Sequence, residues 1–229
     1  MILNIAGSIA STLAIVAVYR HGVHGPHGKS YLFLMLGIVC WFSADLTLMY
    51  YYYALGIEEQ KLVSLTDGFW FAGYLFLALH LLTVLRSISS TIKPGVVIIV
   101  SSVTVLFIVY NIVSLISSEF LIDVEFSAFV VTVAYPILDL VLIIPSAIIL
   151  VSLRKEYQHS IPWFLSSLSL LVNAIADDGY VNDFVMGNSQ DLWVWDLFYA
   201  TDFIIMAGAL FWYNKFHISN EIKNARLER

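Results

Sequence analysis

Charged residues and cysteines are scarce in this chain of 229 residues. Only 12% of its residues are Asp, Glu, Lys or Arg, and its single cysteine, Cys40, lies inside an apolar stretch. One cysteine excludes both an intramolecular disulfide and a CxxC metal motif. A soluble domain usually contains about 25% charged residues. The composition therefore excludes an ordinary soluble globule.

Hydrophobic residues, in contrast, make up 60% of the chain, and the mean hydropathy is +0.85. The few polar residues cannot cover so much apolar surface in water, so a polytopic membrane protein is expected. The net charge is −6, and the basic residues are scattered along the chain. We therefore expect the lipid bilayer as a partner, and no nucleic acid.

A helix of about 20 residues crosses the hydrocarbon core of a bilayer. Seven apolar stretches approach or exceed this length: 2–19, 31–55, 66–86, 95–117, 127–152, 161–181 and 195–216. The first lacks a basic n-region and a cleavage site, so it is predicted to be a retained helix. The predicted fold is an all-α membrane bundle of seven transmembrane helices over 1–216, followed by a cytoplasmic tail over 217–229.

The basic residues indicate how this bundle is oriented. Apart from Lys61, every Lys and Arg falls after the first, third or fifth predicted helix or in the tail. Basic loops stay on the cytoplasmic side, so the N-terminus is predicted outside and the C-terminus inside the cell membrane. Weak similarity between the second-to-third and the sixth-to-seventh helix hairpins also suggests a 3+1+3 arrangement.

Carboxylates occur within the predicted helices, although such groups cost several kcal/mol in a bilayer unless they face protein or water. Asp45, Asp139 and Asp177 fall between the middle of the membrane and its outer surface. No Lys or Arg lies at membrane depth to pair with them. Protonation, hydrogen bonds, water or a bound cation must therefore stabilise them. Asp67 and Asp196 begin helices, where an acid can cap the helix or be solvated.

Helical spacing places these acids on faces that also carry aromatic and polar residues. Five such faces, converging on one centre, predict a ligand pocket that opens to the outside. The candidate ligand-binding residues are Trp41, Asp45, Asp67, Trp70, Tyr74, Tyr135, Asp139, Asn173, Asp177, Tyr199 and Asp202. Pro136 lies one turn before Asp139 and predicts a bend in that helix.

The histidines give weaker evidence for a functional site. His21, His24 and His27 occur within seven residues and are weak candidates for metal ligands. The glycines and the proline among them are expected to prevent a regular helix, which favours a polar turn. His80 does not share the polar face of Asp67, and it is predicted to be a hydrogen-bonded packing residue.

Several functional classes require residues that this sequence lacks. Retinal is not expected as a cofactor, because the only lysine near the last helix, Lys215, lies at its cytoplasmic edge. A zinc hydrolase would need several histidines within the membrane, where only His80 is available. No GxSxG, HExxH or phosphate-binding glycine motif occurs, so an enzyme is not expected.

The order of several motifs resembles the N-terminal multi-helix sensor region of bacterial and archaeal signalling proteins. They are Trp41 with Asp45, the segment from Asp67 to Tyr74, Tyr135-Pro136-x-x-Asp139, Asp177 to Tyr180, and Asp191-Leu192-Trp193 with Asp196. In those families this region precedes a diguanylate cyclase, phosphodiesterase or histidine kinase output domain. The chain is too short for such a domain, so we expect either signalling through a partner or a different use of the same helical bundle.

The leading hypothesis is a membrane sensor or receptor-like module that binds a small cationic ligand or a proton in an acidic pocket of the outer half. A cation or small-solute transporter or channel is the first alternative, because a cavity lined by carboxylates also suits an ion pathway. A structural subunit of a membrane complex is the second alternative.

Overall fold

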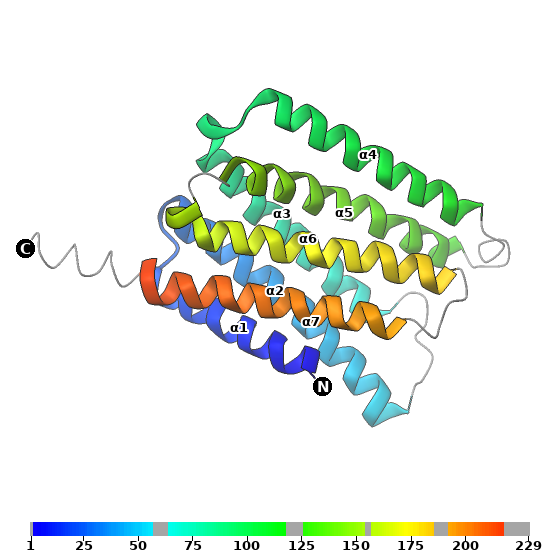
Figure 1. Ribbon diagram of the computed structural model, residues 1–229. Helices are drawn as coiled ribbons and strands as arrows, with labels where there is room; N and C mark the ends of the chain where they lie inside the picture. Colours follow the sequence, from blue (N-terminus) through cyan, green and yellow to red (C-terminus); the bar gives the residue numbers. More distant parts are fainter. Residues whose placement is uncertain (1, 57–63, 118–125, 154–156, 186–191, 218–229) are drawn as a thin grey trace, which may run out of the picture.

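Seven long helices account for nearly all of the described residues, which are 2–56, 64–117, 126–153, 157–185 and 192–217, in the computed structural model (Figure 1). They are α1 (Ile2–His21), α2 (Gly25–Leu55), α3 (Leu65–Ser87), α4 (Pro94–Ile116), α5 (Phe126–Leu153), α6 (Tyr157–Val185) and α7 (Leu192–Trp212). A 3-10 turn (Ser89–Thr91) follows α3, and a π-helical turn (Tyr213–His217) follows α7. This part of the chain has no β-strand, as an all-α fold requires.

Six of these helices are long and apolar enough to cross a membrane: α1, α2, α3, α4, α5 and α7. The chain is therefore a multi-pass membrane protein by the length and composition of its helices. α6 is not among the six, although its 29 residues include the predicted stretch 161–181. Its C-terminal half carries Asn173, Asp177 and Asp178, which lower its hydropathy, and Asn173 and Asp178 are buried.

Six helices form a closed ring, and α4 lies outside it. Around the ring each helix packs against the next in the order α1, α2, α3, α5, α6, α7 and back to α1. α4 packs along α5 at the edge of the bundle (Figure 1). Much of its apolar surface is exposed, including Leu106 and Tyr110 at 70% and 71%. A membrane helix in this position turns its side chains toward lipid.

The connection between α1 and α2 corrects one expectation from the sequence. The segment with His21, His24 and His27 was predicted to be a turn, but α2 already begins at Gly25. Pro26 lies in the first turn of the helix, where its missing N–H costs no hydrogen bond. The reversal itself needs glycine, because Gly22 and Gly25 have φ angles of 81° and 71°.

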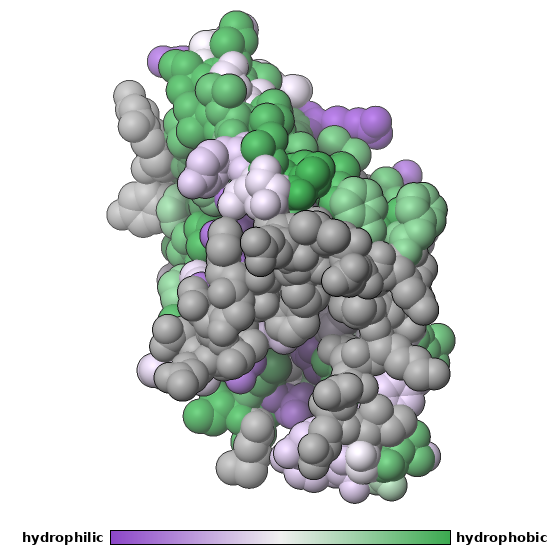
Figure 2. Space-filling view, turned by 90° about the vertical axis from the view of Figure 1, so that its right-hand side faces the viewer, coloured by the Kyte–Doolittle hydropathy of each residue, from purple (hydrophilic) through white to green (hydrophobic). Residues whose placement is uncertain are grey.

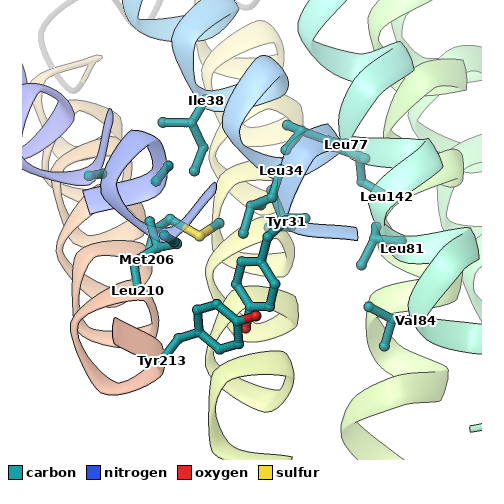
Figure 3. Packing of buried hydrophobic residues seen from close by; sticks show 14 of the residues in the cluster. Tyr31, Leu34, Ile38, Leu77, Leu81, Val84, Leu142, Met206, Leu210 and Tyr213 are labelled. Carbon is teal, nitrogen blue, oxygen red and sulfur yellow. The ribbon is translucent and has the colours of Figure 1, made fainter. Parts of the chain in front are cut away.

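An apolar core fills one half of the ring. Figure 3 shows its side chains meeting from α2, α3, α5, α7 and the π-helical turn after α7; they are Tyr31, Leu34, Ile38, Leu77, Leu81, Val84, Leu142, Met206, Leu210 and Tyr213. α1 joins this core through a stripe of buried alanines four or three residues apart, from Ala6 to Ala17. Small side chains on one helical face allow close helix contacts.

The two ends of the ring differ in charge. Arg20, Lys29, Arg86, Lys93 and Lys215 lie where α1, α3 and α7 end and α2 and α4 begin, which we call the basic end. The opposite end carries Asp67, Asp183 and Asp196, and we call it the acidic end. Tyr74, Asp139 and Asp202 all lie on the acidic-end side of the core residues of their own helices. These polar residues thus lie in the half of the ring nearer the acidic end, which the apolar core does not fill.

Candidate functional site

One tyrosine connects two acids from different helices. The Tyr74 Oη atom on α3 lies 2.6 Å from Asp139 Oδ1 on α5 and 2.5 Å from Asp177 Oδ2 on α6. Tyr74 is 3% exposed and Asp139 is fully buried. These contacts are short because each involves an acidic oxygen. They join three consecutive helices of the ring at one point.

Asp177 has further donors on its own helix and on α7. Tyr199 donates to Asp177 Oδ1 at 2.7 Å, and Asn173, one turn earlier on α6, donates to Asp177 Oδ2 at 3.0 Å. We call Tyr74, Asp139, Asn173, Asp177 and Tyr199 the acidic cluster. All five were predicted as ligand-binding residues, and the structure brings them together.

Asp67 and Tyr135 form a second pair beside this cluster. Asp67 accepts a hydrogen bond from the Ser64 backbone N–H at 2.7 Å, so it caps the start of α3 as predicted. Its other oxygen accepts from the Tyr135 hydroxyl at 2.7 Å. The Tyr135 ring also lies 6.3 Å from that of Tyr74. Asp67 therefore has a structural role and also places a carboxyl group beside the cluster.

Aromatic rings hold Tyr74 in place from the α2 side. The Trp41 ring packs edge-on against Tyr74 at 5.3 Å and donates from Nε1 to the Trp70 carbonyl oxygen at 3.2 Å. Trp70 in turn packs against Tyr135 at 6.2 Å. The close approach of the Trp41 ring to α3 depends on Gly73, because a Cβ atom at this position would overlap the ring. Gly73 was not among the predicted site residues, although it stands next to Tyr74 in the sequence.

Two buried acids in this region retain unpaired oxygens. Asp139 Oδ2, and both carboxyl oxygens of Asp178, are buried without a hydrogen-bond partner among the described residues. Asp178 is only 7% exposed and lies within electrostatic range of Asp139 and Asp177. A buried ionised carboxylate without a partner is costly. The geometry therefore favours positive charge here.

The remaining predicted acids lie close to the cluster without joining its hydrogen bonds. Asp202 is 2% exposed, and the Ser169 hydroxyl on α6 lies within hydrogen-bond distance of both its carboxyl group and, at 3.0 Å, its backbone carbonyl oxygen. Asp45 on α2 is half-buried and lies within electrostatic range of Asp177 and Asp196. Asp202 thus links α6 to α7 one turn away from Tyr199. Asp45 faces the same acidic region from α2.

No basic side chain enters this region from the helices that build it. The sequence contains no Lys or Arg in 62–85, 94–153 or 156–214. His80 is fully buried nearer the basic end, where it bonds Ser30 on α2 at 2.8 Å and contacts Ser166 on α6 at 3.4 Å. This confirms His80 as a hydrogen-bonded packing residue. It leaves the carboxyl groups without a cationic side chain from these helices.

The three histidines at the basic end do not form a metal centre. Among the described residues, no group of three or more His, Cys, Asp or Glu is placed to hold a metal ion. The His27 ring stacks on Trp163 at 4.5 Å, and His21 packs against Tyr213 at 5.9 Å. Because α2 begins at Gly25, His24 precedes the helix while His27 lies within its first turn. The metal hypothesis for His21, His24 and His27 thus has no support here.

Hydrophilic residues are visible at the acidic end of the molecule. Figure 2 faces this end and shows some of them low in the view, with hydrophobic residues to either side. The acidic cluster lies deeper in the same half of the ring, roughly 12 Å along α3 and α7 from where these helices begin, at about 1.5 Å per residue.

Comparison with family models, with curated proteins and with solved structures found no match. The acidic cluster is therefore the feature of the molecule from which a function can be proposed.

Proposed function

We propose that all seven helices span the membrane, with the N-terminus outside and the C-terminus in the cytoplasm. The support for α6 as a span is its length of 29 residues and its place within the ring. The support for the orientation is that Arg20, Lys29, Arg86, Lys93 and Lys215 share one end. Two runs of three helices, α1–α3 and α5–α7, would then give a 3+1+3 arrangement around the peripheral α4.

We propose further that the protein is a membrane sensor or receptor-like module whose acidic cluster binds a small positively charged species, either a cation or a proton. One observation carries this proposal: Tyr74 joins Asp139 and Asp177, while one buried oxygen of Asp139 has no hydrogen-bond partner in the described part of the chain. Ionisable groups at membrane depth that lack an opposite charge are functional candidates. A positive species would neutralise the cluster and pull its helices together.

The helices of the cluster can transmit such a change along the bundle. Asp139 follows Pro136 by one turn of α5, and a proline inside a helix removes a backbone hydrogen bond and allows bending. α7 carries Tyr199 near the acidic end and is tied to α1 at the basic end. There Arg20 donates to the Asn214 carbonyl oxygen at 2.8 Å, and the Asn214 side chain donates to the Leu13 carbonyl oxygen at 3.0 Å. A signalling partner would bind at the basic end and respond to the change in its conformation.

A pair of spin labels at the basic end tests the sensor proposal. Cys40 is first replaced by serine, and Ser90→Cys and Phe216→Cys then place labels on exposed residues after α3 and α7. The distance between the two labels is measured by pulsed electron paramagnetic resonance at acidic and neutral pH and with sodium, magnesium, calcium or putrescine. We expect the distance distribution to shift under at least one of these conditions, because a bound charge shifts the population of conformations.

Two variants give this experiment its controls. Asp139→Asn should abolish the shift, whereas Asp196→Asn, at an exposed acid of the same end, should retain it. One distribution under all conditions, with the labels in place, would overturn the sensor proposal. Co-purification of a membrane partner without any response would favour the structural-subunit alternative.

Transport is the second candidate, and one observation favours it. One face of α6 carries four polar residues, which are Ser166, Ser169, Asn173 and Asp177. This polar face extends from Ser166, which contacts His80, to the acidic cluster. A polar face that runs along the bundle suits the movement of an ion or proton. Flux of protons or sodium into liposomes, abolished by Asp139→Asn, would establish transport. Its absence would leave the sensor proposal.

A further inference from the structure

The acidic cluster contains more acceptors than Tyr74 can serve. A phenol has one hydrogen and donates one hydrogen bond, while its oxygen can also accept. Yet Tyr74 Oη lies 2.6 Å from Asp139 Oδ1 and 2.5 Å from Asp177 Oδ2. Two bare carboxylate oxygens cannot both receive the same hydrogen. One of these two contacts therefore requires a hydrogen that belongs to a carboxyl group.

The other contacts of the two acids show which one carries this hydrogen. Asp177 receives N–H and O–H donors from Asn173 and Tyr199, as an ionised carboxylate does. Asp139 receives no such donors, and its Oδ2 is buried without a partner among the described residues. A neutral acid tolerates this environment far better than an anion. The Tyr74 hydrogen is thus directed to Asp177, and Asp139 donates to Tyr74.

We infer that Asp139 is a proton-binding residue and that Tyr74 relays its proton to Asp177. This inference rests on the proposed function and names the positively charged species as a proton. In the relay, the Asp139 O–H bond breaks as a new O–H bond forms at Tyr74 Oη. The original Tyr74 hydrogen passes to Asp177 Oδ2 at the same time. One proton moves from Asp139 to Asp177, and the phenol is regenerated.

Among the described residues, no Lys or Arg side chain lies beside the relay. The titratable groups within electrostatic range of the relay or of its direct neighbours are acids and phenols: Asp45 on α2, Asp67 on α3, Tyr135 on α5, Asp178 and Tyr180 on α6, and Tyr199, Asp196 and Asp202 on α7. Within the described residues no group of three or more His, Cys, Asp or Glu is placed to hold a metal ion. The contact that Tyr74 shares between two acids, together with the unpartnered oxygen of Asp139, points to a proton as the positive species.

Infrared spectroscopy of the full chain in lipid tests the inference. A protonated aspartic acid has a C=O stretching band separate from that of a carboxylate. At neutral pH we expect this band in the difference spectrum between wild type and Asp139→Asn. We expect no such band in the difference between wild type and Asp177→Asn, which is the matched control on the other side of Tyr74. Asp139→Glu should retain the band at a shifted frequency.

Each outcome decides the assignment. Other buried acids such as Asp178 can add bands of their own, so the difference spectrum is decisive: no band between wild type and Asp139→Asn would overturn the assignment. Loss of the band in Asp177→Asn with retention in Asp139→Asn would also overturn it, because the proton would then belong to Asp177. If Asp139→Asn does not fold, the absence of a frequency shift in Asp139→Glu has the same meaning. A band that behaves as expected, in a protein whose spin labels show no response, would overturn the sensor proposal and leave the proton site intact.

Discussion

Tyr74→Phe should destabilise the protein by roughly 2 kcal/mol or more, although the substitution removes a single oxygen atom. Asp139 Oδ1 and Asp177 Oδ2 both lose a partner in a buried site. A polar group left unsatisfied in the interior costs about 1–3 kcal/mol. Asn173 and Tyr199 still serve Asp177, so most of the loss should fall on Asp139. The melting temperature in detergent measures the effect.

Tyr110→Phe provides the matched control for this prediction. Tyr110 is 71% exposed on the peripheral α4, so the same substitution should change stability by less than about 0.5 kcal/mol. If both substitutions lowered stability equally, the effect would come from removing any tyrosine hydroxyl and not from the contacts of Tyr74 in the acidic cluster. No effect at Tyr74 would mean that water replaces its contacts.

Gly73→Ala should destabilise the protein by about 1–3 kcal/mol, the usual cost of overpacking a closely packed interior. The added Cβ would overlap the Trp41 ring, so α2 and α3 must separate or the ring must rotate. Either movement lengthens the Trp41 hydrogen bond to the Trp70 carbonyl and disturbs the ring contact with Tyr74. Thermal unfolding and the spin-label response should therefore change together.

Gly68→Ala tests the same change in the same helix where there is room. Nothing lies within 4 Å of a Cβ atom at Gly68. Alanine should be neutral or stabilise this variant by up to about 1 kcal/mol, because it favours helix more than glycine does. If both substitutions lowered stability equally, the close approach of Trp41 to Gly73 would be contradicted.

The sequence predicted the helices and most of the residues of the site, because both follow from periodicity. Seven apolar stretches were predicted as membrane spans, and six of the helices are long and apolar enough to be such spans. The spacing of polar residues placed Tyr74, Asp139 and Asp177 on inward faces. Periodicity along one helix cannot specify partners on another helix. That Asp202 pairs with Ser169, while Asp177 pairs with two tyrosines, depends on the relative rotation of the helices, which appears only in the structure.

Two features lay outside what the patterns could predict. The peripheral position of α4 follows from how seven helices pack, and its sequence is as apolar as a buried helix would be. The start of α2 at Gly25 was misjudged because glycine and proline usually interrupt helices, whereas proline in the first turn is tolerated. The resemblance to multi-helix sensor regions stays a prediction. The tail over 218–229 lies outside the described residues.

The central claim is that the acidic cluster binds positive charge, and the melting temperature of the purified protein tests it most directly. The measurement covers a pH series and a panel of metal ions and polyamines, with Asp139→Asn alongside wild type. The folded protein holds a proton that the unfolded chain would release, so wild-type stability should fall as pH rises from mildly acidic to mildly alkaline. A ligand at 100 times its Kd would add about 2.7 kcal/mol.

Lowering the pH should stabilise wild type, and this shift should be smaller in Asp139→Asn. A shift with one metal ion or polyamine, also lost in the variant, would keep the site and change its ligand. Equal pH dependence in both proteins, no shift with any cation, and an Asp139→Asn variant as stable as wild type would contradict the claim that this cluster binds positive charge.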